Sequence, residues 1–190
     1  MSEMSRLGKF FVNRRGTRSF ERLLKQVRDE ASFSISPGAR VLELGAGNSM
    51  FSQVLFEAYH PAEIHVTDYD LSQVEVAKSH LRKRYGTIPP AFFTEQADAT
   101  RLSYPDRTFD LVTAHLMLHH LGDSSAIRRG ILEVFRVLRP GGRFLYVEMF
   151  HREMVRDAVL GSGLKVAYSG KTAGMFHSRD IVIAGRPEGT

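Results

Sequence analysis

Residues 40–59 read RVLELGAGNSMFSQVLFEAY, and this stretch decides the class of fold. Residues 40–44 favour a short buried strand that stops at Gly45. Apolar side chains then recur at helical spacing over residues 49–59, so a helix follows. Between the two, Gly45 and Gly47 allow a tight turn and a close approach of the backbone to a ligand. Strand, glycine turn and helix together are the opening unit of an α/β domain.

The rest of the chain alternates in the same way. Apolar periods predict helices over residues 17–33, 71–85, 124–138 and 152–160, and strands over 64–67, 91–96, 109–114 and 143–148. Two last β-like runs, 164–168 and 180–184, lack a clear helix between them and indicate an antiparallel hairpin at the sheet edge. Strands separated by helices imply right-handed crossovers. We therefore expect an α/β fold with a doubly wound, mostly parallel sheet.

Composition is that of one globular domain. The chain has 190 residues, of which 43% are hydrophobic and 25% charged. It has no cysteine, which excludes disulfides, thiolate metal sites and a cysteine nucleophile. No apolar run approaches the ~20 residues that cross a bilayer, and no secretory signal is visible, so a soluble cytoplasmic protein is the expectation. The net charge of +5 permits an anionic partner without identifying one.

Polar side chains at three predicted strand ends are candidate ligand contacts, because open α/β sheets bind ligands there. Glu43 lies inside an apolar strand and needs a hydrogen-bond donor. Asp68 ends the next strand 23 residues after Gly45, close to the ~20 expected of a carboxylate that accepts ribose hydroxyls. Asp98 and Ala99 follow the third strand. Structural readings stay open: the glycines as a plain turn, and Asp98 as a turn residue.

Together these features resemble the class I S-adenosylmethionine-dependent methyltransferases, and most closely the small-molecule branch that includes the ubiquinone/menaquinone enzymes. The similarity runs over residues 39–148. It is carried by VLELGAGNS (41–49), TDYDLSQVEVA (67–77), QADATRLSYPDRTFDLVTAHLMLHHL (96–121) and EVFRVLRPGGRFLYVE (133–148). The resemblance implies a Rossmann-like, seven-stranded sheet whose last strand is antiparallel, in agreement with the hairpin.

The resemblance also implies the cofactor, S-adenosyl-L-methionine, with S-adenosyl-L-homocysteine as its product. Carried over by position, Glu43, Gly45 and Gly47 would contact the methionine end of the cofactor, and Asp68 would bind its ribose. Tyr69 would lie against the adenine face, and Asp98 and Ala99 would contact the adenine edge. His115 would face the methyl sulfonium and the acceptor. Ser49 departs from the family, which often has a third glycine there, and it narrows the space near the cofactor carboxylate.

Methyl transfer from a sulfonium is an in-line displacement in which the protein mainly aligns the reactants. An acceptor hydroxyl or acidic carbon also needs a general base. His115 and Glu148, at the ends of the fourth and fifth predicted strands, are the candidate catalytic residues. His119, His120 and His151 are further candidates, each with a structural alternative as a packing or helix-start residue. No metal site is expected.

The chain has no insertion of substrate-domain length. We therefore expect residues 1–35 to form a helical lead-in or lid, with a loop at 149–154, over a methyltransferase domain at 36–190. Apolar side chains in these segments favour an apolar or aromatic small molecule: Phe10, Phe11, Phe20, Met149, Phe150 and Met154. Arg14, Arg15 and Arg18 could instead bind a phosphate or carboxylate on it. A homodimer is compatible with the sequence.

Three other functions stay open. The sequence pI of about 9.7 prompts an RNA or protein methyltransferase, although the Thr-Ala-His-Leu run at 113–116 lacks the Pro-Pro-aromatic motif of base-amino methylation. A non-catalytic module that binds S-adenosylmethionine is the second. A NAD-dependent oxidoreductase is the third, and Met50 counts against it by occupying the third glycine position of the dinucleotide fingerprint.

Overall fold

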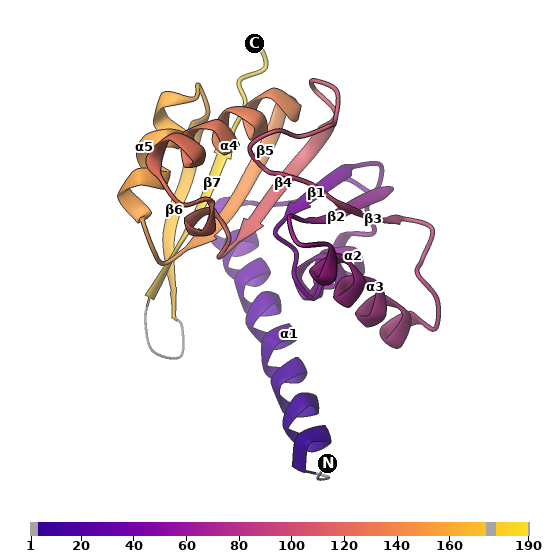
Figure 1. Cartoon of the computed structure of the whole chain (residues 1–190). Coiled ribbons are helices and arrows are strands. Elements are labelled where there is room, and N and C mark those ends of the chain that lie inside the picture. Colours follow the sequence, from indigo (N-terminus) through magenta and orange to yellow (C-terminus); the bar gives the residue numbers. More distant parts are fainter. Residues whose placement is uncertain (1–3, 174–177, 190) are drawn as a thin grey trace.

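The computed structural model describes the backbone of residues 4–173 and 178–189, and the side chains of 16–172 and 178–189. Helices lie on both faces of one seven-stranded sheet (Figure 1). The strands are β1 (Arg40–Leu44), β2 (Glu63–Asp68), β3 (Phe92–Gln96), β4 (Phe109–His115), β5 (Leu138–Glu148), β6 (Lys165–Ala173) and β7 (Ser178–Gly185). The helices are α1 (Met4–Ala31), α2 (Met50–Tyr59), α3 (Leu71–Tyr85), α4 (Ser124–Val137), α5 (Arg152–Gly161) and the 3₁₀ turn η1 (Leu118–Leu121).

The strand order is β3-β2-β1-β4-β5-β7-β6. Every neighbouring pair from β3 to β5 is parallel, and β7 runs antiparallel to both β5 and β6. The predicted mostly parallel sheet with an antiparallel last strand is confirmed. Strand order reverses between β1 and β4, and it is outside the carboxyl ends of such a pair that doubly wound sheets bind ligands.

Each face of the sheet has its own core. On one face, Leu23, Leu24 and Val27 of α1 pack with buried residues of α2, α3 and the strands. On the other, Ile127 and Ile131 of α4 pack with α5 and the opposite side of the same strands. The two cores explain why strands buried on both sides read as nearly continuous apolar runs.

Three elements differ clearly from the sequence prediction, and one of them is β6, which spans Lys165–Ala173 instead of 164–168. The first helix spans 28 residues, from Met4 to Ala31, instead of 17–33, and its N-terminal half extends beyond the sheet (Figure 1). The Arg-Pro-Gly-Gly run at 139–142 ends α4 as expected, but it lies within β5 instead of before it. There the pairing with β4 shifts register between Phe109 and Leu111, so the extra residues form an irregularity that tolerates proline.

The proposed lid over residues 1–35 is only partly visible. Side chains of Phe10, Phe11, Arg14 and Arg15 lie outside the described residues. The later part of α1 is tied to the hairpin, because Gln26 Nε2 donates to the Tyr168 hydroxyl at 3.2 Å. The division at residue 35 stays a prediction. None of the helices described here has the length and apolar character required to cross a membrane.

Replacing Ile127 by alanine tests the α4 side of the core. Ile127 is fully buried, so Ile127→Ala is expected to lower the free energy of unfolding by ~2–5 kcal/mol through lost burial and a residual cavity. Leu132 lies on the same helix with 42% of its surface exposed, and Leu132→Ala is expected to cost less than ~1 kcal/mol. Urea unfolding measures both values, and equal losses would contradict this placement of α4.

Candidate functional site

The turn between β1 and α2 has a left-handed backbone at three positions. The φ angles are +63° at Gly45, +51° at Gly47 and +58° at Ser49. A Cβ at Gly45 would come within 2.6 Å of the Met117 side chain, so the first position requires glycine for space as well as conformation. Ser49, the departure from the family pattern, adopts the glycine-like conformation itself. Its hydroxyl is buried and donates to the Asn48 carbonyl at 2.7 Å.

Glu43 lies directly beneath this turn. Its side chain is only 2% exposed, and its carboxylate accepts a hydrogen bond from the backbone N–H of Ser52 at 3.1 Å and another from the Ser52 hydroxyl. Burial raises the pKa of the Glu43 carboxyl to about 7. The expectation that this acid needs a donor is confirmed, and the donor is the first turn of α2. Glu43 does not itself line the cleft described next.

A cleft of about 730 Å³ opens at the carboxyl ends of β1, β2 and β4, which we call the glycine cleft. Six of the residues predicted to contact a cofactor line it: Gly45, Gly47, Asp68, Tyr69, Asp98 and Ala99. Its opposite side includes Met117 and His120, with Arg129 from α4. Met117, just after β4, and Arg129 were not predicted to line it. Arg129 could not be, since nothing in the sequence spacing brings α4 to this edge.

Asp68 is held at the mouth of the glycine cleft by two backbone donors. Its Oδ2 accepts from the N–H of Gly47 at 3.1 Å, and its Oδ1 accepts from the N–H of Asp70 at 3.0 Å. Asp70 instead caps α3 by accepting from the N–H of Ser72 at 2.8 Å. Tyr69 beside it is 73% exposed. The carboxylate of Asp68 thus has a fixed position, with a large aromatic surface beside it.

Asp98 forms the far end of the glycine cleft. Its Oδ1 accepts from the backbone N–H and the hydroxyl of Thr100, at 2.8 and 2.7 Å. The residue therefore does stabilise a turn, which was the structural alternative. The neighbouring Ala99 is nearly buried. A small side chain here keeps this end of the cleft open between the loop and α4.

The two predicted catalytic residues lie outside the lining of the glycine cleft. His115, at the end of β4, faces α1 and packs edge-on against Phe20 with ring centroids 4.6 Å apart. Burial, together with the positive charge of Arg179, lowers the pKa of His115 to about 4, so its imidazole is neutral at pH 7. In the described part of the chain, the buried Nε of Arg179 has no hydrogen-bond partner.

Glu148, at the end of β5, is fully buried, and neighbouring groups of the protein hydrogen-bond to its carboxylate. The carboxylate accepts from the ring of His119 at 2.8 Å and from the N–H groups of His119, Met149 and Phe150 at 3.3, 2.8 and 3.2 Å. Among the other histidines, His120 lines the glycine cleft, whereas His151 occupies the N-cap position of α5. No cluster of three metal-ligating side chains occurs within the described residues.

Comparison with known proteins agrees with this geometry. A profile of the family described as "Methyltransferase domain" matches residues 42–146, more than half of the chain. The ubiquinone/menaquinone biosynthesis C-methyltransferase UbiE of Vibrio vulnificus (strain YJ016) is 34% identical over 116 residues, which are 59% of this chain and 42% of that protein. The 27-O-demethylrifamycin SV methyltransferase of Amycolatopsis mediterranei (strain S699) is 34% identical over 106 residues, 56% of this chain and 37% of the relative. The chain thus spans less than half the length of either relative.

Solved structures share the fold at low identity. Geranyl diphosphate methyltransferase in complex with SAM superposes with a TM-score of 0.71 at 12% identity, covering 90% of this chain and 85% of that one. The [4+2]-cyclase SpnF also gives 0.71, at 19% identity, covering 87% and 81%. Because the cyclase SpnF has the same architecture, the fold alone does not specify methyl transfer.

Glu43→Gln tests the buried acid. A folded-state pKa near 7, raised from 4.5, means that the folded protein holds a proton that the unfolded chain has lost. Stability from this group is therefore present below pH 4.5 and disappears as pH rises through 7, a change of ~3 kcal/mol. The unfolding free energy of the wild type should fall relative to the variant over that interval, measured by urea unfolding at several pH values. Parallel curves for the two proteins would rule out this assignment.

Proposed function

The chain belongs to the methyltransferase domain family, and from that premise we propose that it transfers a methyl group from S-adenosyl-L-methionine to a small molecule. Besides family membership, one structural observation supports this proposal. Asp68, fixed by the N–H of Gly47, stands at the mouth of the glycine cleft between the left-handed turn and the Asp98–Ala99 loop. A carboxylate so placed can accept both hydroxyls of a ribose.

The residues of the glycine cleft suit the rest of the cofactor. Its volume of about 730 Å³ lies within the ~300–1,000 Å³ typical of small-molecule sites. We assign the ribose to Asp68, the adenine face to Tyr69, and the adenine edge to Asp98 and Ala99. We assign the methionine end of the cofactor to Gly45 and Gly47, and Glu43 holds their turn in position from below.

The bound cofactor supplies the chemistry, a methyl group on a sulfonium. The chain's own residues then have to orient the acceptor and keep water out. Phe20 and Phe51 pack around His115 on the α1 side, within 4.6 and 6.2 Å of its ring. Because the imidazole of His115 is neutral with a low pKa, we assign it the role of hydrogen-bond acceptor in preference to strong base. The carboxylate of Glu148 hydrogen-bonds to His119 and to the backbone that follows it, so we assign Glu148 a positioning role and not that of a base.

The acceptor side of the site is formed, in this proposal, by residues 1–35 as a lid together with the 149–154 loop. Phe150 and Met154 expose half or nearly half of their surfaces there, which favours an apolar acceptor. Arg179 lies near enough to His115 to lower its pKa, and its buried Nε lacks a partner in the described structure. An acceptor with a carboxylate or phosphate would supply one. We also propose a cytoplasmic location.

Asp68→Asn tests the cofactor assignment. Exchanging a charged acceptor for a neutral one should weaken S-adenosylhomocysteine binding by ~10–100-fold, since hydrogen bonds to charged groups contribute ~1.5–3 kcal/mol. Asp123→Asn is the matched control, because Asp123 also accepts a backbone N–H, at 2.7 Å from Ala126, but lies outside the glycine cleft. Isothermal titration calorimetry measures both. Unchanged affinity in Asp68→Asn would overturn the assignment.

Arg179→Gln tests the acceptor assignment. The wild type is incubated with radiolabelled S-adenosylmethionine and pairs of small aromatic acceptors, each pair consisting of an acid and its neutral methyl ester. Labelled product is expected from acids in preference to esters, and Arg179→Gln should raise KM for the acid about tenfold by removing a charge-assisted hydrogen bond. Calorimetry should find its S-adenosylhomocysteine affinity unchanged. An acid KM equal to the wild-type value would refute the role of Arg179.

A further inference from the structure

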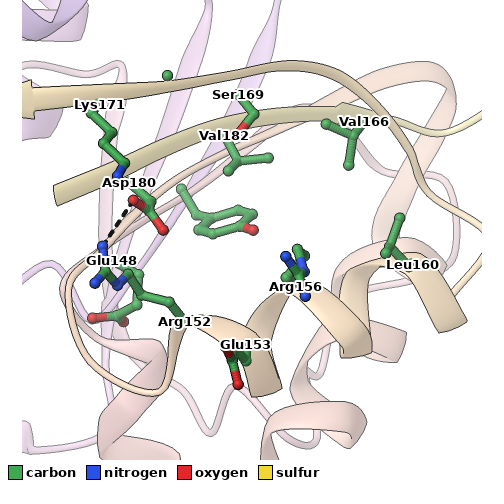
Figure 2. Close-up of a pocket in the computed structure, with 12 residues that line it drawn as sticks. Glu148, Arg152, Glu153, Arg156, Leu160, Val166, Ser169, Lys171, Asp180 and Val182 are labelled. Atoms are coloured by element: carbon green, nitrogen blue, oxygen red, sulfur yellow. Dashed lines mark hydrogen bonds and ion pairs between the residues drawn. The ribbon is translucent and has the colours of Figure 1, made fainter.

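A second cavity, of about 580 Å³, shares no lining residue with the glycine cleft. It lies between α5 and the strands β5, β7 and β6, and we call it the α5 groove (Figure 2). Figure 2 shows Arg156 and Leu160 of α5 facing Val166 and Val182 of the hairpin across the open space. Arg152 and Glu153 of the proposed acceptor-side segment 149–154 line this cavity, but none of the residues assigned to the cofactor does.

Apolar side chains form much of the wall of the α5 groove. Tyr146 and Val182 are buried and belong to the core on the α4 and α5 face. Leu160 and Val166 are 59% and 40% exposed, although both are large apolar residues. Leu160 and Val166 on opposite walls of one concave site offer contact to the apolar body of a ligand.

One polar group in the wall has no protein partner. Tyr146 is only 3% exposed and lines the α5 groove, yet its hydroxyl makes no hydrogen bond to any residue that the structure describes. Burial raises the pKa of this phenol, so the hydroxyl keeps its proton and can donate. This hydroxyl is not enclosed in the core but borders the open space of the α5 groove. An acceptor atom on a ligand would pair it.

Three cationic and three acidic side chains line the α5 groove, but not all of them are paired. Arg152 pairs with Asp180 at 3.1 Å, and Glu148 is occupied by His119. Arg156 contacts only its chain neighbour Asp157, at 3.8 Å between largely exposed side chains. Lys171, on β6, has no carboxylate within ion-pair distance in the described residues. Among the residues described, Arg156 and Lys171 therefore lack an acid partner across the groove, and either can pair with a negative group on a ligand.

We propose that the α5 groove binds a small amphipathic acid. Its apolar body contacts Leu160 and Val166, its acidic group pairs with Arg156, and one of its oxygens accepts from the hydroxyl of Tyr146. The volume of about 580 Å³ is that of a site for one small molecule. None of the residues assigned to the cofactor lines the groove, and the test does not depend on activity.

The probe for the test is 1-anilinonaphthalene-8-sulfonate, which joins an apolar ring system to one sulfonate and fluoresces when bound. The wild type is expected to bind it with one-to-one stoichiometry. Arg156→Gln should weaken binding about tenfold, and Tyr146→Phe about threefold, as expected for a charged and a neutral hydrogen bond. N-phenyl-1-naphthylamine, the same ring system without sulfonate, should be insensitive to Arg156→Gln.

Arg128→Gln is the control, because Arg128 is exposed on α4, outside the α5 groove, and its loss changes the net charge equally. It should leave the Kd of the sulfonate unchanged. Methyl NMR provides an independent readout: the resonances of Leu160 and Val166 should shift during the titration. The proposal is wrong if these resonances stay fixed, if Arg156→Gln and Tyr146→Phe both bind as the wild type does, or if Arg128→Gln weakens binding as much as Arg156→Gln.

Discussion

The connection from β1 to α2 is the constraint on which the rest of the molecule depends. Within five residues the chain must leave a fully buried strand and start a helix, and it does so through three left-handed positions. Two carboxylates hold this path from below and from the side: Glu43 binds the first turn of α2 through Ser52, and Asp68 binds Gly47 from the end of β2. The glycine cleft is the space that this arrangement leaves open. One turn thereby sets the helix, the neighbouring strand end and the cleft together.

Features fixed by local chemistry could be predicted from the sequence. Apolar periods located the strands and helices, and β1 and α3 agree with their predicted ranges to the residue. The glycine spacing and the interval to Asp68 identified the residues that meet at one edge. The length of α1 and the irregularity at Pro140 and its following glycines could not be predicted in this way, because both depend on pairing and packing with distant segments.

The acceptor side was harder to predict for the same reason. A histidine at a strand end suggests a general base. It can accept a proton near neutral pH only where water or a carboxylate contacts the ring and stabilises the charged form. Phe20, about a hundred residues earlier in the chain, covers His115 and helps to keep it neutral. Glu148 was predicted from its position, whereas its partner His119 follows from how η1 folds back onto β5. The strand-end positions of His115 and Glu148 were predicted correctly, whereas their electrostatic surroundings required the tertiary structure.

The left-handed turn also bears on how such proteins diverge. At Gly45 and Gly47 the parts presented to the cleft are peptide groups, and peptide groups are the same whatever amino acids surround them. Mutation can therefore replace most side chains elsewhere while this geometry is inherited unchanged. Superpositions with TM-scores of 0.71 at 12% and 19% identity show the same fold built from largely different side chains. A cleft lined by main-chain groups can therefore keep its shape while the side chains around it change.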